Sequence, residues 1–408
     1  MNNSKLITFK NGLRLEFVTK PQNMVQATFK VAFMVGSEDE KKEEGLAHLL
    51  EHCMFKGTKE YTQEQLSIEL DKICAMPNAS TSAEFTIYEA KFPKFNIESL
   101  IELFSKMIFE STFDESGIEN EKLVVIEEIK MHNDVPSDCA FDQLTNTMYA
   151  GTGLGFDIAG DEKLLKKLTR QDLIDFRNTH YIPENTIISV VGDFDEKIIM
   201  ELIEKYFASR FCEINSALKE QKKWTQEVHN KPQVVVKNKK INQANVMMGA
   251  YTTGYGHPDR LKLAIILFAI GGSMSSRLFI KLRNQLSLCY SIYADQLNYK
   301  NNGFMLIDFS TTTPNCDKAI EEVKKVIDEA LNSGITNDEF ELAKSVLLNN
   351  FLMGQDVPQA HISYLAYTGE LFDSRLREQE IRSLQKQDCE EAFKKYISSE
   401  KFFISIVK

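Results

Sequence analysis

The sequence predicts an α+β protein of two similarly built domains, each a mostly antiparallel β-sheet packed with α-helices. Three observations support this fold class. Segments in which apolar residues alternate, typical of half-buried strands, are interspersed with longer segments of helical periodicity. The order of these segments in the first half of the chain recurs in the second half. Finally, 408 residues are too many for one ordinary hydrophobic core, so two domains of about 200 residues are expected.

The first half opens with a predicted hairpin, because Asn11-Gly12, a strong tight-turn signal, separates two short apolar stretches. Every second residue from Ala27 to Val35 is apolar, which predicts a half-buried strand ending at Gly36. The other elements follow from the same two periodicities. Helices are expected at 44–55, 97–109, 118–132 and 170–180, and further strands at 6–9, 13–17, 86–92 and 186–191.

The second half repeats this order. Strands are expected at 244–249, 290–297, 304–309 and 402–407, and helices at 261–270, 318–331 and 337–352. A local echo supports a duplication, because Ser116-Gly117-Ile118 and Ser333-Gly334-Ile335 each precede a late predicted helix. The polar stretch 213–231 is the best candidate for a linker. The predicted domains are therefore residues 1–212 and 232–408.

The composition restricts the class of protein and its compartment. A net charge of −11 without a basic stripe argues against nucleic acid as a partner. No apolar run approaches the roughly 20 residues that a membrane helix needs, and the first residues contain no signal-peptide core. The seven scattered cysteines lack CxxC spacing, which is typical of reduced thiols. We therefore expect a cytoplasmic protein that does not contact a membrane.

The clearest chemical signal is the segment His48-Leu49-Leu50-Glu51-His52, an H-x-x-E-H motif in a predicted helix. At about 100° per residue, the two histidines and the glutamate share one face, and leucines project to the opposite side. Two histidines four residues apart can bind one zinc ion, and Glu51 can reach a metal-bound water as general base. The alternative is two helix-surface histidines beside an unrelated glutamate.

A catalytic zinc site needs a third protein ligand and an open position for water. Glu121 and Glu128 lie two turns apart on a predicted helical face that also carries Val124, Val125 and Met131. Burying two carboxylates among apolar residues is costly unless a metal or a hydrogen-bond donor compensates. Glu127 is the rival ligand, although it points about 100° away from Glu128. A helix with a solvated acidic edge is the alternative to a metal site.

The residues from Gly45 to Thr58, with the sequence GLAHLLEHCMFKGT, resemble the signature of the pitrilysin family of zinc peptidases. That family includes insulin-degrading enzyme and the mitochondrial processing peptidase. Its third ligand is a glutamate some 76 residues beyond the second histidine, and here 128 − 52 = 76 selects Glu128. A glutamate seven residues earlier, Glu121 here, supports the family's site. The resemblance thus implies one Zn²⁺ ion per chain, bound by the two motif histidines and Glu128.

The resemblance covers most of the chain. Asn78-Ala79 and the residues after it resemble the edge strand along which the family binds the substrate backbone. The stretch from Ser275 to Phe279, followed by Arg283 and Tyr290, resembles the C-terminal motif that contacts the substrate opposite the zinc. In this reading Arg283 holds the substrate main chain and Tyr290 donates a hydrogen bond to the developing oxyanion.

The resemblance implies a zinc metalloendopeptidase that hydrolyses peptides or small unfolded polypeptides within an enclosed chamber. Family members of this length form half of a clamp-like chamber and pair. Because this chain carries both motifs, a homodimer is expected, with a homologous paired subunit as the alternative. A leader- or propeptide-processing protease and a non-catalytic scaffold subunit are the alternative functions. Two departures from the family pattern bear on substrate preference, Cys74-Ala75 in place of paired glycines and Ser287 in place of a glycine.

Overall fold

The computed structural model describes residues 4–41, 44–73, 76–213, 220–355 and 360–408. Cys74-Ala75 therefore lies outside the described residues. The chain forms two compact units, each assembled from segments that are not contiguous in sequence. The first comprises Met1–Lys130, Phe156–Lys223 and Val357–Phe372, and the second comprises Met131–Gly155, Trp224–Asp356 and Asp373–Lys408. The contiguous domains 1–212 and 232–408 stay a prediction.

The first unit contains a six-stranded sheet in the order β1-β2-β6-β3-β5-β4. Its strands are β1 (Ser4–Thr8), β2 (Arg14–Thr19), β3 (Gln26–Phe33), β4 (Met76–Thr81), β5 (Thr86–Pro93) and β6 (Thr186–Gly192). β1 and β2 form the predicted hairpin, and Gly12 between them has a φ of 93°, which a glycine adopts without strain. β2 and β6 pair in parallel, and the other neighbouring strands are antiparallel.

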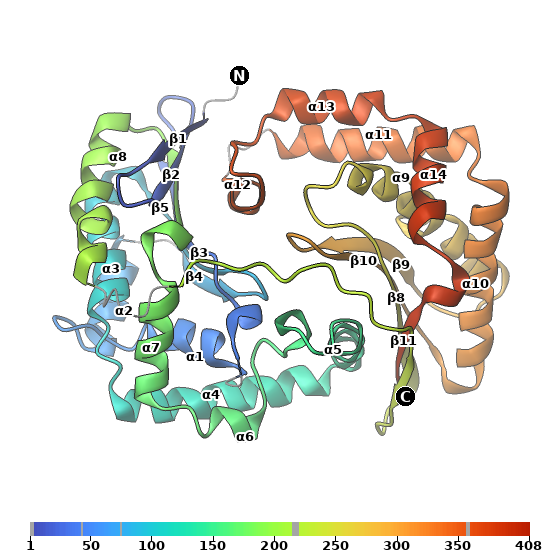
Figure 1. Cartoon of the computed structure of the whole chain (residues 1–408), viewed down its shortest axis with the longest axis horizontal. Coiled ribbons are helices and arrows are strands. Elements are labelled where there is room, and N and C mark those ends of the chain that lie inside the picture. The colour runs from blue at the N-terminus through green and yellow to red at the C-terminus, as the bar shows by residue number, and fades with distance from the viewer. Residues whose placement is uncertain (1–3, 42–43, 74–75, 214–219, 356–359) are drawn as a thin grey trace. The chain divides into compact units, whose positions relative to one another are not determined.

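Helices pack on one face of this sheet, where Figure 1 shows α3 and α8. The helices of this part of the chain are α1 (Leu46–Cys53), α2 (Gln63–Ile73), α3 (Ile97–Glu110), α4 (Glu115–Asp134), α6 (Glu162–Leu165), α7 (Arg170–His180) and α8 (Glu196–Ile203). Aromatic rings join sheet and helices. Phe29 of β3 meets Phe104 of α3 with ring centroids 5.5 Å apart, and Phe33 stacks on Tyr181 at 3.6 Å. Close packing of these large side chains contributes much of the burial energy of this core.

The opposite face of the sheet holds α12 (Ile362–Thr368), a helix from late in the sequence. The carboxylate of Glu16 on β2 accepts hydrogen bonds from the backbone N–H of His361 and from the hydroxyl of Ser189. Tyr367 donates a hydrogen bond from its hydroxyl to Glu84, which is also buried. These polar contacts explain why a distant segment of the chain belongs to the first unit.

The second unit contains a five-stranded sheet in the order β7-β11-β8-β10-β9. Its strands are β7 (Val234–Lys237), β8 (Gln243–Tyr251), β9 (Ile292–Asn298), β10 (Gly303–Thr312) and β11 (Phe403–Val407). β7 and β11 are parallel, and the remaining pairs are antiparallel. If β1 is left out and the strands of each sheet are numbered in sequence order, both sheets have the spatial order first, fifth, second, fourth, third. The predicted α+β class with two mostly antiparallel sheets is confirmed.

The helices of the second unit include α9, which occupies the position that α1 has in the first, between the second and third strands of its sheet. Where α1 carries the motif histidines, α9 is apolar after Lys262, and most of these apolar residues are buried. The helices are α5 (Pro136–Met148), α9 (Asp259–Gly271), α10 (Cys316–Ser333), α11 (Asn337–Gly354), α13 (Ser374–Ser383) and α14 (Lys386–Tyr396). Among the helices of the described residues, none is both long and apolar enough to cross a membrane.

The two similar tripeptides, Ser116-Gly117-Ile118 and Ser333-Gly334-Ile335, do not occupy equivalent positions in the two units. Ser116 and Gly117 lie inside α4, whereas Gly334 follows the last residue of α10 with a φ of 70°. Gly334 therefore ends a helix, and Gly117 belongs to the start of one. The repetition of the fold rests on the strand order instead.

Part of the predicted linker is fixed to the first unit. The ammonium group of Lys222 is buried 2.5 Å from a carboxylate oxygen of Glu38 and 2.6 Å from one of Asp39. The side-chain amide of Asn185 forms two hydrogen bonds with the backbone of this segment. Its oxygen accepts from the N–H of Lys222, and its nitrogen donates to the carbonyl of Glu220. Paired in this way, a buried lysine is tolerated in a segment whose composition is otherwise typical of a solvated linker.

Candidate metal centre

The helix α1 is built so that one side enters the core and the other carries the motif. Leu46, Leu49, Leu50 and Cys53 are buried in the core of the first unit, as the helical spacing predicted. At the start of the helix, Gly45 takes a left-handed φ of 90°. The carboxylate of Glu40 accepts hydrogen bonds from the backbone N–H groups of Gly45, at 3.0 Å, and Ala47, at 2.7 Å. Those N–H groups have no acceptor within the helix, so Glu40 replaces an N-cap side chain.

His48, His52 and Glu128 converge although they come from helices far apart in sequence. One potential ligand atom from each lies within 4.8 Å of those of the other two. The Nε2 atoms of His52 and His48 lie 3.6 and 3.9 Å from Oε2 of Glu128. Two imidazoles and one carboxylate are a donor set of catalytic zinc sites, which leave the fourth position open. The residues present therefore fit a zinc ion.

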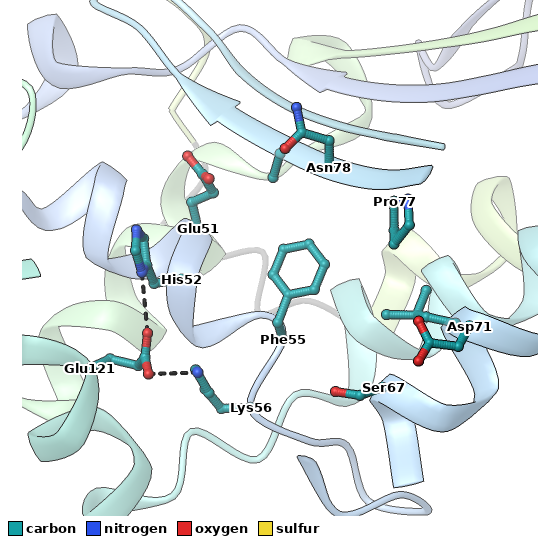
Figure 2. A pocket seen from close by; sticks show the side chains of 11 residues that line it. Glu51, His52, Phe55, Lys56, Ser67, Asp71, Pro77, Asn78 and Glu121 are labelled. Atoms are coloured by element: carbon teal, nitrogen blue, oxygen red, sulfur yellow. Dashed lines mark hydrogen bonds and ion pairs between the residues drawn. The ribbon is translucent and has the colours of Figure 1, made fainter. Parts of the chain in front are cut away.

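Glu121 orients the imidazole of His52. Its Oε2 lies 3.1 Å from Nδ1 of His52, and its Oε1 lies 2.5 Å from Nζ of Lys56 (Figure 2). If Nδ1 carries the proton and donates to Glu121, Nε2 is free to bind a metal. Burial alone would raise the pKa of Glu121, but the contacts with His52 and Lys56 outweigh it and lower that pKa. Glu121 is thus an anion that holds His52 without belonging to the cluster of His48, His52 and Glu128.

The two histidines have opposite electrostatic surroundings. Burial, with a smaller effect of His52, lowers the pKa of the His48 imidazole to about 4, which keeps it neutral at pH 7. Burial opposes the charge on His52 as well, but its hydrogen bond to Glu121 and the nearby carboxylates outweigh this, so its pKa is raised. The negative charge that attracts a proton to His52 also favours a metal cation. Among the described residues, Nδ1 of His48 is buried without a hydrogen-bond partner.

Glu51 lies beside the two histidines on α1 and is directed toward β4 (Figure 2). Its side chain is largely buried, and burial raises the pKa of the carboxyl group. The hydroxyl of Thr81, at the end of β4, donates a hydrogen bond of 2.5 Å to Oε2 of Glu51. A carboxyl group whose pKa is raised toward neutrality suits a general base.

The face of α4 differs in part from the sequence-based expectation. Glu121 is buried, but the side chain of Glu128 is 41% exposed. Val124 and Met131 are exposed as well, so the predicted burial of two carboxylates among apolar residues is wrong for Glu128. Glu127 points into solvent and pairs with Lys130 at 2.7 Å. The helical twist separates Glu127 from Glu128, and only Glu128 meets the histidines.

Asn78 and Ala79 lie on β4, which is an edge strand of the first sheet. Within the described residues, no strand pairs with the outer side of β4. A pocket of about 390 Å³ separates this strand from α1 and α2, with the ring of Phe55 between them (Figure 2). Its lining residues are Glu51, His52, Phe55, Lys56, Ser67, Leu70, Asp71, Pro77, Asn78, Ala79 and Glu121.

Arg283 and Tyr290 belong to the second unit, where the structure brings them together. The guanidinium carbon of Arg283 lies 4.9 Å from the centre of the Tyr290 ring and 4.6 Å from that of Phe279. Tyr290 is 80% exposed and precedes β9, which begins at Ile292 rather than at the predicted Tyr290. The Arg–Tyr contact is a cation–π interaction at an exposed site, which leaves both polar ends available to a ligand.

Two polar residues of the site did not stand out in the sequence. Lys56 follows His52 by one helical turn, and its pairing with Glu121 is visible only when α1 and α4 are brought together. Thr81 belongs to the stretch that resembles the family's edge strand, yet its position in a short polar strand gives no sign of a contact with Glu51. Both contacts depend on tertiary structure.

Known proteins are similar to this chain over most of its length. Residues 17–162 match the family model described as insulinase (peptidase family M16), and residues 167–347 match the one described as peptidase M16 inactive domain. An uncharacterized zinc protease of Bacillus subtilis, YmxG, is 30% identical over 360 residues, covering 88% of this chain and 86% of that one. An uncharacterized zinc protease of Rickettsia felis is 29% identical, covering 87% of this chain and 84% of its own length.

Solved structures share the fold over the full length of the chain. A protease from Helicobacter pylori aligns with a TM-score of 0.87 and 21% identity, covering 100% of this chain and 99% of that one. A peptidase M16 inactive domain from Pseudomonas fluorescens aligns with a TM-score of 0.88 and 17% identity, covering 99% and 98%. The family resemblance inferred from the sequence is confirmed. This chain belongs to peptidase family M16, the insulinase family.

Proposed function

We propose that this protein is a zinc metalloendopeptidase that hydrolyses peptides or small unfolded polypeptides. The observation that carries the proposal is the convergence of His48, His52 and Glu128 beside the carboxylate of Glu51. Relatives named zinc protease support it. One Zn²⁺ ion per chain, held by the two imidazoles and Glu128, is the metal that this donor set fits. A bound zinc ion supplies Lewis acidity, which acidifies water to a pKa of about 7 and polarises a carbonyl group.

Glu51 is the general base in this proposal. It accepts the proton of the attacking water and later donates it to the leaving amine, which is the role of a carboxylate in this motif. Its burial supports the assignment, because the raised pKa eases the return of the proton. Glu121 keeps His52 oriented throughout, since its carboxylate holds Nδ1.

Asn78 and Ala79 on the edge strand β4 bind the substrate backbone in this proposal. An extended peptide that adds to an edge strand pairs through main-chain hydrogen bonds, which are independent of its sequence. The pocket between β4, α1 and α2 would then receive one substrate side chain. Backbone pairing of this kind selects extended, unfolded segments over folded proteins.

The roles of Arg283 and Tyr290 come from the family resemblance. Arg283 holds the substrate main chain, and the hydroxyl of Tyr290 donates to the developing oxyanion. The exposure of Tyr290 and its contact with Arg283 support a pair that meets a ligand. We further propose that the chain acts in the cytoplasm as half of an enclosed chamber, paired with a second copy. Gel filtration at the size of a monomer with full activity would overturn the pairing.

The decisive experiment combines metal analysis with peptide cleavage. Zinc-loaded protein is incubated with a peptide library, and cleavage sites are found by mass spectrometry. The parent and the matched control Glu127→Gln should bind one zinc ion and cleave internal bonds. Glu51→Gln should keep the zinc and lose about 10²- to 10⁴-fold in rate, the usual contribution of a general base. Glu128→Gln should lose zinc affinity. A Glu51→Gln variant that cleaves as fast as the parent would refute the mechanism.

A further inference from the structure

Thr81 directs its hydroxyl at the side chain of Glu51. The donor and acceptor oxygens are 2.5 Å apart, and the acceptor is Oε2 of the carboxylate. In the part of the chain that the structure describes, no other hydrogen bond reaches the Glu51 carboxylate. Within the described residues the second oxygen, Oε1, accepts no hydrogen bond, and Glu51 is one of the residues that line the pocket.

We propose that Thr81 is a positioning residue for Glu51. By holding Oε2, the hydroxyl fixes the rotation of the carboxylate, so that Oε1 is the atom that takes the proton from water. This inference rests on the proposed peptidase function and adds to it a residue that acts through Glu51. A glutamate on a helix surface has three rotatable bonds, and a second attachment point removes much of that freedom.

The hydrogen bond from Thr81 is compatible with both protonation states of Glu51. A carboxylate oxygen accepts the Thr81 hydrogen bond while Glu51 is an anion. When the proton is placed on Oε1, Oε2 becomes a carbonyl oxygen and still accepts the same bond. The hydroxyl therefore does not have to release Glu51 during the reaction, and the proton is always presented at the same atom.

The backbone at Thr81 is itself fixed. Thr81 is the last residue of β4 and pairs with Thr86 of β5, and the turn that follows packs against the chain after β3. There the backbone N–H of Ser37 donates to the carbonyl of Ser82 at 3.2 Å, and that of Glu38 donates to the carbonyl of Ala83 at 3.0 Å. A Cβ atom on Gly36 would collide with the Ser82 carbonyl, so this close approach requires glycine. The position of the Thr81 hydroxyl is thus fixed by the pairing of β4 with β5 and by the hydrogen bonds of the turn that follows β4.

The test compares Thr81→Val, which keeps the shape and removes the hydroxyl, with Thr81→Ser, which keeps the hydroxyl. Cleavage of a fluorogenic peptide drawn from the library substrates gives kcat and KM. Hydrogen bonds to charged groups have effects of about 10- to 100-fold, so Thr81→Val should lower kcat by that factor with KM within about twofold. Thr81→Ser should recover most of kcat. Thr28→Val, the same change on the strand β3 and away from the residues that line the pocket, serves as the control and should match the parent.

Two further measurements separate positioning from structure. Zinc content and melting temperature should be the same in the parent, Thr81→Val and Thr81→Ser. A crystal structure of Thr81→Val should show the Glu51 carboxylate rotated or in several rotamers. A Thr81→Val variant with the kcat of the parent, or with Glu51 unmoved, would overturn the inference. If instead Glu51→Gln is fully active in the same assay, the proposed function fails and not merely the role of Thr81.

Discussion

Oε2 of Glu121 lies 3.1 Å from Nδ1 of His52, across two helices separated by 69 positions in sequence. This contact fixes which nitrogen of the imidazole faces Glu128. Removal of its negative charge should weaken zinc binding, because a carboxylate behind a metal-binding histidine raises the basicity of the ligand.

Glu121→Gln is expected to reduce zinc affinity about 10- to 100-fold, the usual effect of losing such a partner. Competition with a chromogenic chelator measures this change. Glu119→Gln is the matched control, because Glu119 lies on the same helix with a 70% exposed side chain, and it should bind zinc like the parent. Equal affinities of the two variants would mean that Glu121 does not act through His52.

Glu40→Ala is expected to destabilise the protein by about 2–4 kcal/mol, because it leaves two buried N–H groups at the start of α1 without acceptors. Urea unfolding of the metal-free protein measures the free energy of unfolding. Glu44→Ala is the control, because Glu44 lies near Asp157 and Asp161, and its removal relieves like-charge repulsion. Loss of stability in Glu44→Ala alone would contradict the capping role of Glu40.

Ser287→Gly is expected to stabilise the second unit. Ser287 has a φ of 51°, in the left-handed region that costs a non-glycine residue about 1–2 kcal/mol. Glycine avoids that strain but loses more backbone entropy on folding, so the net gain should be about 0.5–1 kcal/mol. The departure from the family's glycine therefore has a physical cost. Melting temperatures of Ser287→Gly and Ser287→Ala distinguish the backbone from the side chain, since alanine should bring no gain.

The buried His180 predicts a loss of stability in acid. Burial lowers the pKa of its imidazole from 6.5 to about 4, so the unfolded chain binds the proton more tightly than the folded one. The stabilisation is present above pH 6.5 and is lost as pH falls toward 4. Between pH 7 and pH 5 this amounts to about 2 kcal/mol from one group.

His180→Gln removes this titration and should flatten the pH dependence of the free energy of unfolding by that amount. Urea titrations of the metal-free protein at pH 7 and pH 5 provide the comparison. His229→Gln, at a side chain that is 68% exposed, should keep the slope of the parent. If the free energy of unfolding changes equally with pH in the parent, His180→Gln and His229→Gln, then His180 is not held neutral by the fold.

Periodicity predicted much of the fold because amphipathic segments bury one side. The strand from Ala27 and the leucine face of α1 are examples, since in both the apolar residues lie in the core. The polar helix α13 was not predicted, because only Ile381 of its residues is buried and its sequence resembles a solvated loop. The helices α2, α5, α8 and α14 were not predicted either, although α8 buries Ile199, Leu202 and Ile203. The strand β7 is too short and too exposed to show a pattern.

The candidate site was predictable where its residues are neighbours in sequence. His48, Glu51 and His52 follow from helical spacing alone. Glu128 was selected over Glu127 by the family spacing, and the structure places it 3.6 Å from His52 while Glu127 faces solvent. Thr81, Lys56 and Glu40 act through contacts between elements. No local pattern reveals such contacts, because they depend on how β4, α4 and the loop before α1 pack.

The repeated strand order has a consequence for how such a protein can diverge. The sheet around α9 folds with no ligand on the helix that matches α1, so the architecture is complete without a metal. The same arrangement of strands therefore accommodates two kinds of helix at this position, one that carries His48, Glu51 and His52 and one that is mostly apolar. The residues of the H-x-x-E-H motif are thus not required by the architecture itself.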